Sequence, residues 1–284
     1  MTDEEKKRRR ISFYELGTHK YRLTLDGEMQ VNTMNIKSTV SNNFVLQVKE
    51  VDETEAVIDL VTYDKEMIAC TNPAFKEMFA VTRQLEKLYD EMTVRLSLEG
   101  EVLDIYSMDI FEEKWQRLKN ENVPYFGEST DIEDFFKLNT ENVSNKDFWI
   151  NILNEQEFFF LFFQLGGYGQ KYAYVKDIYR YNAFRNNKLK WEIVSSPYET
   201  DRATNRKRVD IEGWFNAGKG WLKESYGKMP ILADVKLDPH FAIDAFYVFD
   251  YNTGWISEAG ITIEEIAHPS ILFHKMNYKL SLIS

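Results

Sequence analysis

The segment Tyr21-Arg-Leu-Thr-Leu25 decides the fold class of this chain. Its apolar side chains alternate with polar ones, which is the period of two expected for a β-strand with one buried face. The same alternation continues over residues 29–36, 44–48 and 56–60, and its parity switches at Asn32-Thr33, which predicts a tight turn or a bulge. Because the connections between these strands are short, the pattern predicts an antiparallel meander.

A helix and a hairpin are predicted to follow the meander. Asn72 can cap the helix and Pro73 suits its first position, while apolar residues recur every three or four positions as far as Met92. One face of this helix is expected to lie on the sheet. Alternating residues on both sides of an acidic and glycine turn predict a hairpin over residues 93–106.

The middle of the chain, up to residue 168, is predicted to be mainly helical. Asp109 and Glu112 resemble a capping box, which predicts one helix start. Ser144 and Asp147 suit a second helix start.

The run from Phe158 to Phe163 is the most unusual feature of the sequence. It contains five phenylalanines in six residues, and these cover every side of a helix. Such a helix is either enclosed by the core on all sides or leaves rings facing a partner or a cavity. The core interpretation is favoured, because enclosed helices are ordinary in large domains. The other interpretation makes Phe158, Phe159, Phe162 and Phe163 candidates for contact with an apolar ligand or an interface.

Strand patterns resume at Trp191 and continue to Leu282. The predicted fold class is therefore α+β, with curved antiparallel sheet meanders packed with amphipathic helices, in two similar halves separated by a helical insert. We expect a flexible charged tail over residues 1–10, a β-meander with helices over 11–125, a mainly helical aromatic-rich segment over 126–184 and a β-rich half over 185–284. The two β-rich parts are expected to form one compact unit.

Composition narrows the range of partners. The 284 residues include 35 Lys and Arg against 46 Asp and Glu, which gives a formal net charge of −11. This charge works against binding nucleic acid or an anionic membrane surface, and it favours a basic or neutral protein partner. The basic cluster at residues 202–208 is accordingly expected at an exposed hairpin tip. Aromatic residues make up 15% of the chain, which requires a thick core, a ligand cavity or a contact surface.

The cysteine content fits a reducing compartment, and hydropathy bears on membrane insertion. The single cysteine, Cys70, excludes an internal disulfide and every multi-cysteine metal site. No apolar run reaches the roughly 18 residues that a membrane-spanning helix needs. Residues 1–10 carry charges with no apolar stretch behind them, so the sequence predicts a cytoplasmic protein if this N-terminus is native.

The sequence contains no recognisable catalytic, cofactor or metal-binding signature. The glycine clusters at residues 166–169 and 213–220 lack the spacing of a nucleotide-binding loop, and the four histidines lack a metal-ligand spacing. We therefore expect no cofactor and no metal. A hydrolase with dispersed catalytic residues stays open as a hypothesis, in which His240 would meet carboxylates such as Asp238 and Asp244.

The first part of the chain resembles a known superfamily. The strands over residues 21–60, the helix over 72–92 and the hairpin over 93–106 together are similar to the half-barrel of the lipoprotein-carrier superfamily and its uncharacterised relatives from Bacteroidetes. The resemblance is architectural and covers about the first 120 residues of the sequence. It implies a curved sheet whose concave apolar face holds a helix or an acyl chain.

Three functions are compatible with these patterns. The favoured one is a non-enzymatic binding protein whose acidic, aromatic-rich surface engages another protein, and an immunity-type inhibitor of a secreted toxin is one such case. Its expected contact residues are Trp214, Phe215, Trp221 and Trp255, for which core packing is the alternative role. The second function is a carrier of an apolar ligand in a cavity between sheet and helix. The third is the hydrolase described above.

Overall fold

The computed structural model describes residues 15–52, 54–97, 99–126, 140, 142–166, 174–229 and 235–283, so the expected charged tail lies outside the described residues. Within them, twelve strands form one antiparallel sheet in the order β5-β4-β3-β2-β1-β12-β11-β10-β9-β7-β6, with β8 paired to β9. The strands are β1 (Gly17–Val31), β2 (Met34–Val51), β3 (Glu55–Cys70), β4 (Glu91–Ser97), β5 (Val102–Ile105), β6 (Tyr174–Tyr181), β7 (Lys188–Ser195), β8 (Glu199–Asp201), β9 (Arg206–Trp214), β10 (His240–Asp250), β11 (Ile256–His268) and β12 (Leu272–Ile283). The helical elements are α2 (Pro73–Glu86), η1 (Lys87–Tyr89), α3 (Met108–Phe126), α5 (Lys146–Glu155), α6 (Glu157–Phe159), the π-helical η2 (Phe160–Leu165) and α7 (Lys219–Tyr226).

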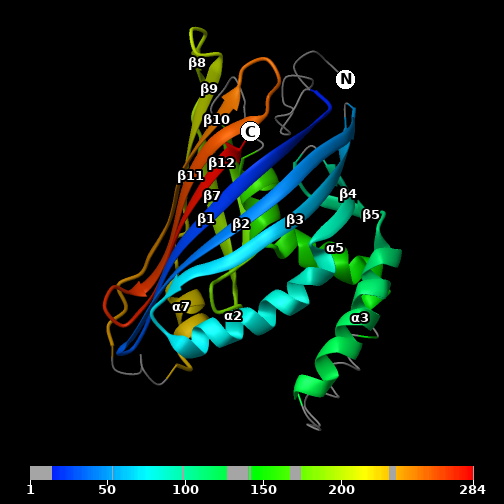
Figure 1. Cartoon of the computed structure of the whole chain (residues 1–284). Coiled ribbons are helices and arrows are strands. Elements are labelled where there is room, and N and C mark those ends of the chain that lie inside the picture. Colours follow the sequence, from blue (N-terminus) through cyan, green and yellow to red (C-terminus); the bar gives the residue numbers. More distant parts are fainter. Residues whose placement is uncertain are drawn as a thin grey trace.

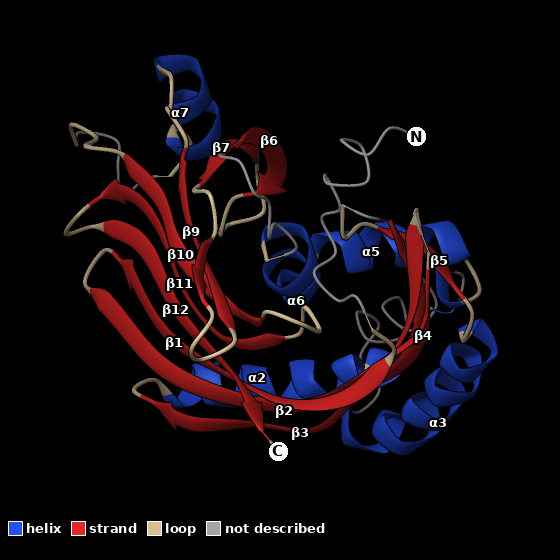
Figure 2. Ribbon diagram, turned by 90° about the horizontal axis from the view of Figure 1, so that it is seen from above, coloured by secondary structure: helices blue, strands red, loops and turns tan. Residues whose placement is uncertain are grey.

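The strands form one curved sheet that is open between β5 and β6 (Figures 1 and 2). β1 and β12 pair antiparallel, from Lys20 opposite Ile283 to Val31 opposite Leu272. This pairing joins the strands that precede the helices of residues 108–166 to those that follow them. The predicted α+β class, with a curved antiparallel sheet and helices inserted between two sets of strands, is confirmed.

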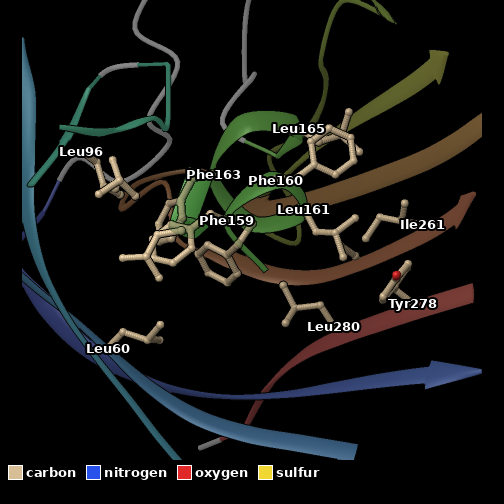
Figure 3. Close-up of a cluster of buried hydrophobic side chains, with 14 of the residues drawn as sticks. Leu60, Leu96, Phe159, Phe160, Leu161, Phe163, Leu165, Ile261, Tyr278 and Leu280 are labelled. Atoms are coloured by element: carbon tan, nitrogen blue, oxygen red, sulfur yellow. The ribbon is translucent and has the colours of Figure 1, made fainter. Parts of the chain in front are cut away.

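The concave face of the sheet carries the hydrophobic core, and α6 and η2 fill it. Buried side chains alternate along the strands, as in Phe44, Leu46 and Val48 of β2. The Tyr247 hydroxyl of β10 donates a hydrogen bond to the Leu161 carbonyl of η2 at 2.7 Å, which fixes the helical segment on the sheet. Figure 3 shows side chains of this segment between strands of both sides, namely Leu60 and Leu96 on one side and Ile261, Tyr278 and Leu280 on the other.

Two local predictions for the first half of the chain are confirmed. Asn32 adopts a φ of 55° in the turn between β1 and β2. The Asn72 side chain accepts a hydrogen bond from the Phe75 amide at 3.2 Å, and α2 begins at Pro73. α2 runs alongside β3 (Figure 1), but none of its residues is fully buried, and Met78 is 55% exposed. The sheet therefore covers only part of the apolar face of this helix.

The end of α2 differs from the prediction. The helix stops at Glu86, and Met92, predicted on the same helical face, is a buried residue of β4. Arg83 makes a bidentate ion pair with Asp90, with Nη1–Oδ1 and Nη2–Oδ2 distances of 2.9 and 2.7 Å, and so holds the turn through η1. The apolar pattern extended to Met92 because apolar residues of α2, of the turn η1 and of β4 follow one another at helical spacing.

The predicted starts of α3 and α5 are each displaced by a residue. α3 begins at Met108 and places Asp109 inside its first turn, because Ser107 precedes the helix and its hydroxyl accepts a hydrogen bond from the Thr93 amide at 3.1 Å. α5 is capped by Asn145, whose side chain accepts from an amide of the first turn, rather than by Ser144.

The strand β6 was not predicted, and it lies inside the segment 126–184 that we expected to be mainly helical. Its outward residues include Val175 and Tyr179, which are 64% and 59% exposed. The basic cluster lies only partly at the expected hairpin tip: residues 202–205 form the turn between β8 and β9, whereas residues 206–208 belong to β9 and Lys207 is buried.

Candidate ligand cavities

A cavity of about 210 Å³ lies between the concave face of the sheet and α6, and we call it the apolar cavity. Strands β1, β2 and β3 supply one wall, and α5, α6 and η2 supply the opposite wall. Most of its lining is aliphatic or aromatic, as in Leu25, Val40, Leu60, Met92, Phe158 and Phe159. The strand alternation explains this wall, because every second residue of each strand points into the concave face.

The apolar cavity also contains polar groups, of which one charged pair forms an ion pair and one buried oxygen has no hydrogen-bond partner among the described residues. Lys65 Nζ lies 2.6 Å from Glu86 Oε2, so these two charges neutralise each other. Asn42 lies on β2 opposite Leu23 of β1 and Lys65 of β3, and its Oδ1 atom is buried without a hydrogen-bond partner among the described residues. A buried acceptor without a partner costs about 1–3 kcal/mol. The apolar cavity thus offers one unsatisfied acceptor to a molecule that enters it.

A second cavity, of about 200 Å³, lies on the same concave face near β6, β11 and β12, and we call it the polar cavity. Charged or titratable side chains from four elements line it, namely Glu157 of α6, Arg180 of β6, Glu265 of β11 and His274 of β12. Glu157 also lines the apolar cavity, so the two cavities are neighbours.

Arg180 is the main cation inside the polar cavity. Its guanidinium carbon lies 4.1 Å from the centroid of the Phe160 ring, and its Nη2 donates to the Glu155 carbonyl at 3.2 Å. Among the described residues, its Nη1 is buried without a hydrogen-bond partner and forms no direct ion pair, although the charges of Glu157 and Glu155 favour the protonated guanidinium. Burial lowers the pKa of this guanidinium from its ordinary value.

Glu265 and His274 are both shifted toward their uncharged forms. Glu265 is 7% exposed, and burial raises the pKa of its carboxyl group to about 7, although its Oε2 accepts a hydrogen bond from the Ala183 amide at 2.7 Å. Burial lowers the pKa of His274, whose Nδ1 is buried and has no hydrogen-bond partner among the described residues. The polar cavity therefore contains two titratable groups that are sensitive to any charge placed beside them.

The four candidate phenylalanines divide into two pairs. Phe158 and Phe159 line the apolar cavity. Phe162 and Phe163 are 4% and 2% exposed and belong to the core, where the Phe162 ring lies 5.2 Å from the ring of Tyr21. Contact with an apolar ligand therefore stays a prediction for all four residues. Of these, Phe158 and Phe159 are placed where a ligand in the apolar cavity would touch them.

The four predicted protein-contact residues do not form one patch. Trp255 is 3% exposed and packs against His19, with ring centroids 4.0 Å apart. Phe215 and Trp221 are half-buried and pack edge to face, with centroids 4.8 Å apart, and Trp221 Nε1 donates to the Lys188 carbonyl at 2.8 Å. The fourth residue, Trp214, is half-buried at the end of β9. Protein contact through these residues, including inhibition of a toxin, stays a prediction from sequence.

The residues of the hydrolase hypothesis lie outside both cavities. His240 has a side chain that is 61% exposed, and its Nε2 lies 3.5 Å from Glu264 Oε2. Asp238 and Asp244 are also exposed, and neither lines the apolar or the polar cavity. The carboxylate that His240 meets is thus Glu264 of the neighbouring strand and not either of the two expected ones.

Sequence reasoning missed the residues of the polar cavity, although the sequence contains a signal for two of them. Glu265 has the same strand parity as the buried residues Ile261 and Ile263, and His274 has the same parity as Met276 and Tyr278. A polar residue at the buried parity of an otherwise apolar strand marks either a satisfied core group or a site. The positions of Glu157 and Arg180 gave no such signal.

The described residues contain no group of three or more His, Cys, Asp or Glu side chains placed to hold a metal ion. Across the same ranges, no helix has the length and the apolar character that are required to span a lipid bilayer.

Comparison with known proteins shows only distant similarity. No protein-family model and no curated protein matches the sequence. Among solved structures, lipovitellin, in a study of its lipid–protein interactions, aligns with a TM-score of 0.39 and 10% identity over 94% of this chain. The chain spans only 25% of that lipovitellin chain. A β-barrel-like protein of a domain of unknown function from Brucella abortus aligns with a TM-score of 0.26 and 9% identity, over 95% of this chain and 100% of that one. At these TM-scores the similarity assigns neither a family nor a ligand to the chain.

Proposed function

We propose that this chain is a carrier that takes an apolar ligand into the apolar cavity. The observation that supports this function is a space of about 210 Å³, lined mostly by aliphatic and aromatic side chains, between a curved sheet and a helical segment. Each Å² of apolar ligand surface that such a wall removes from water contributes roughly 25 cal/mol to binding. A relation to the lipoprotein-carrier superfamily is part of the same proposal and is supported by this architecture.

The size of the apolar cavity limits what it can hold. In another protein, a cavity of about 150 Å³ with a wholly apolar lining binds benzene. The present cavity, at about 210 Å³, therefore accommodates a small apolar molecule or one section of a hydrocarbon chain, and a longer chain would extend beyond it. The unpartnered Asn42 Oδ1 favours a ligand that donates one hydrogen bond near its apolar part, such as a long-chain alcohol.

Titration with 1-decanol, followed by calorimetry, tests the proposal directly. This probe is uncharged, so its binding reports on the apolar cavity and not on the charges of the polar cavity. We expect saturable binding to the full chain. Mass spectrometry of an organic extract of the purified protein is expected to show a co-purified apolar compound.

A matched pair of variants locates the binding. Val40→Phe places a ring in the apolar cavity and is expected to weaken decanol binding roughly tenfold or more, since it occupies the space that the chain would fill. Val175→Phe makes the same change on exposed β6 and is expected to leave binding unchanged. Absence of decanol binding by the wild type, or equal binding by both variants, would contradict the proposed function.

A second variant covers the case in which Val40→Phe fails to fold. Asn42→Leu removes the unpartnered acceptor and is expected to weaken binding of decanol while binding of decane is kept or strengthened. Equal losses for both probes would mean that Asn42 does not face the ligand.

A further inference from the structure

The polar cavity contains a guanidinium group that forms no direct ion pair with a carboxylate of the described residues, although Glu157 and Glu155 lie near enough to act on its charge. Arg180 presents Nη1 without any hydrogen-bond partner among the described residues, and its other contacts are a carbonyl oxygen and the face of the Phe160 ring. Buried guanidinium groups are normally paired with a carboxylate, because removal from water is costly for an isolated charge. The space beside Arg180 is about 200 Å³, which is large enough for several waters or for a small charged group.

A second unpartnered atom lines the same space. His274 Nδ1 is buried without a hydrogen-bond partner within the described part of the chain, and in the tautomer that carries its proton it is a donor, like Arg180 Nη1. Two unsatisfied nitrogen atoms in one cavity are complementary to a group with two acceptor oxygens. A hydrogen bond from a charged guanidinium to a carboxylate oxygen is roughly twice as strong as one between neutral groups.

The charges around the cavity limit the ligand to a single negative charge. Arg180 and the exposed Arg185 supply two positive charges, whereas Glu157 and Glu265 face the same space. Glu155 also lines the cavity, but its carboxylate lies 3.6 Å from Lys188 Nζ and is neutralised there. A dianion such as phosphate would meet more repulsion from the two glutamates than a monoanion would.

We propose that the polar cavity is a binding site for a carboxylate, held by Arg180 Nη1 and His274 Nδ1. This site is separate from the one that takes the apolar ligand, and it does not depend on that function. The carboxylate belongs either to a small free acid or to the head of an amphiphile whose chain reaches the neighbouring apolar cavity.

The dependence of binding on pH follows from the groups that face the site. A bound anion favours the protonated form of Glu265, which can then donate a hydrogen bond to it. The other facing groups are Glu155 and Glu157 from the helical side, Arg180 and Arg185 from β6 and its turn, and His274 from β12. Tyr278, which interacts with Glu157, and Tyr226, which interacts with Glu265, have pKa values raised by burial and stay neutral. Affinity is therefore expected to rise as the pH falls from 8 toward 6.

The test uses sodium acetate and sodium decanoate as probes, titrated into the full chain by calorimetry at constant ionic strength. Arg180→Met removes the charge while keeping an apolar chain on the Phe160 ring, and it is expected to weaken carboxylate binding roughly tenfold or more. Arg208→Met is the matched control, because Arg208 also lies over a phenylalanine ring, at 4.4 Å from the centroid of Phe246, but it has its own carboxylate partner in Asp210. This control is expected to bind as the wild type does.

The two probes distinguish the source of the carboxylate. Binding of acetate that depends on Arg180 indicates a small free acid, whereas binding of decanoate alone with the same dependence indicates an amphiphile. If Arg180→Met fails to fold, Arg180→Lys tests the same contact. This variant keeps the positive charge but loses the planar guanidinium that carries Nη1, so it is expected to bind carboxylates more weakly than the wild type. The proposal is overturned if the wild type binds neither acid, or if binding is the same in the Arg180 variants. Decanol binding that persists in Arg180→Met would show that the apolar site stands even when the carboxylate site fails.

Discussion

Glu265 of β11 and His274 of β12 stand directly opposite each other in the sheet, and both side chains line the polar cavity. In a surface sheet such a pair would be an ordinary cross-strand ion pair. Here burial raises the pKa of the glutamate and lowers that of the histidine, so both are displaced away from their charged forms. The pair therefore links the protonation of the cavity to the stability of the sheet.

The first prediction concerns Glu265→Gln. Since the folded-state pKa of Glu265 is about 7 and its ordinary value is 4.5, the folded state binds the proton more tightly than the unfolded state does. Stability from this group is thus present below the unfolded pKa and is lost as the pH rises to 7. The variant should match the wild type near about pH 4 and exceed it by about 3 kcal/mol at about pH 8. Urea unfolding across this range measures the difference, and a constant offset between the two proteins would contradict the prediction.

The second prediction separates two neighbouring phenylalanines. Phe162→Ala should lower the free energy of unfolding by about 3–5 kcal/mol, because its ring is buried against Tyr21 and Phe44. Phe158→Ala should cost less, since this half-buried ring faces the apolar cavity, and it should enlarge the space for the probe. Chemical denaturation with decanol titration compares the two. Equal losses of stability with no change in probe affinity would refute the assignment of Phe158 to the cavity wall.

The third prediction uses two glycines. Gly100 adopts a φ of 81°, and a Cβ at this position would overlap the backbone carbonyl of Phe163 in η2. Gly100→Ala should therefore lower stability by about 2–4 kcal/mol through an unfavourable φ and forced displacement of the helical segment. Gly218→Ala is the control, because a Cβ there meets no atom within 4 Å, and its thermal midpoint should stay close to that of the wild type. If Gly100→Ala unfolds at the same temperature as the wild type, the turn between β4 and β5 does not contact η2.

The fourth prediction distinguishes protein contact from packing at the tryptophans. Trp221→Ala should lower the free energy of unfolding by about 2–3 kcal/mol, somewhat less than a fully buried tryptophan costs, because its ring packs on Phe215 and Phe241. Trp214→Ala should lower the free energy of unfolding by a smaller amount than Trp221→Ala does. If the predicted protein partner uses this region, the Trp214 variant should lose capture in a pull-down from the native host while it keeps its melting temperature. Normal capture by a folded Trp214 variant would count against this contact.

Local periodicity predicted most of the sheet, because inward and outward positions of β1, β2 and β3 differ in polarity. β6 was not predicted, because its inward and outward positions do not differ in polarity in this way. Its outward face carries Val175 and Tyr179, and its inward face carries Arg180 beside the buried Ile178, so side-chain polarity does not alternate with burial along this strand. Capping residues located α2 from its start, but its end depends on the ion pair between Arg83 and Asp90, which no period reveals.

The residues of the polar cavity could not be grouped from sequence periodicity. Glu157, Arg180, Glu265 and His274 are distant in sequence and meet only because the sheet brings β6, β11 and β12 around α6. The parity of Glu265 within β11 marked it as inward, yet only the assembled sheet shows which groups share that space. The apolar cavity was easier to anticipate, since alternating strands and an aromatic helical run both indicate an enclosed apolar surface.

The pairing of β1 with β12 has a consequence for biosynthesis. β1 leaves the ribosome before the other described strands, whereas its second neighbour, β12, is translated only after β2 to β11. Until then one side of β1 presents unsatisfied amide and carbonyl groups over more than ten residues, which is a template for wrong pairing between nascent chains. Assembly of this protein thus waits for its last strand, and molecular chaperones that shield open sheet edges should raise its yield.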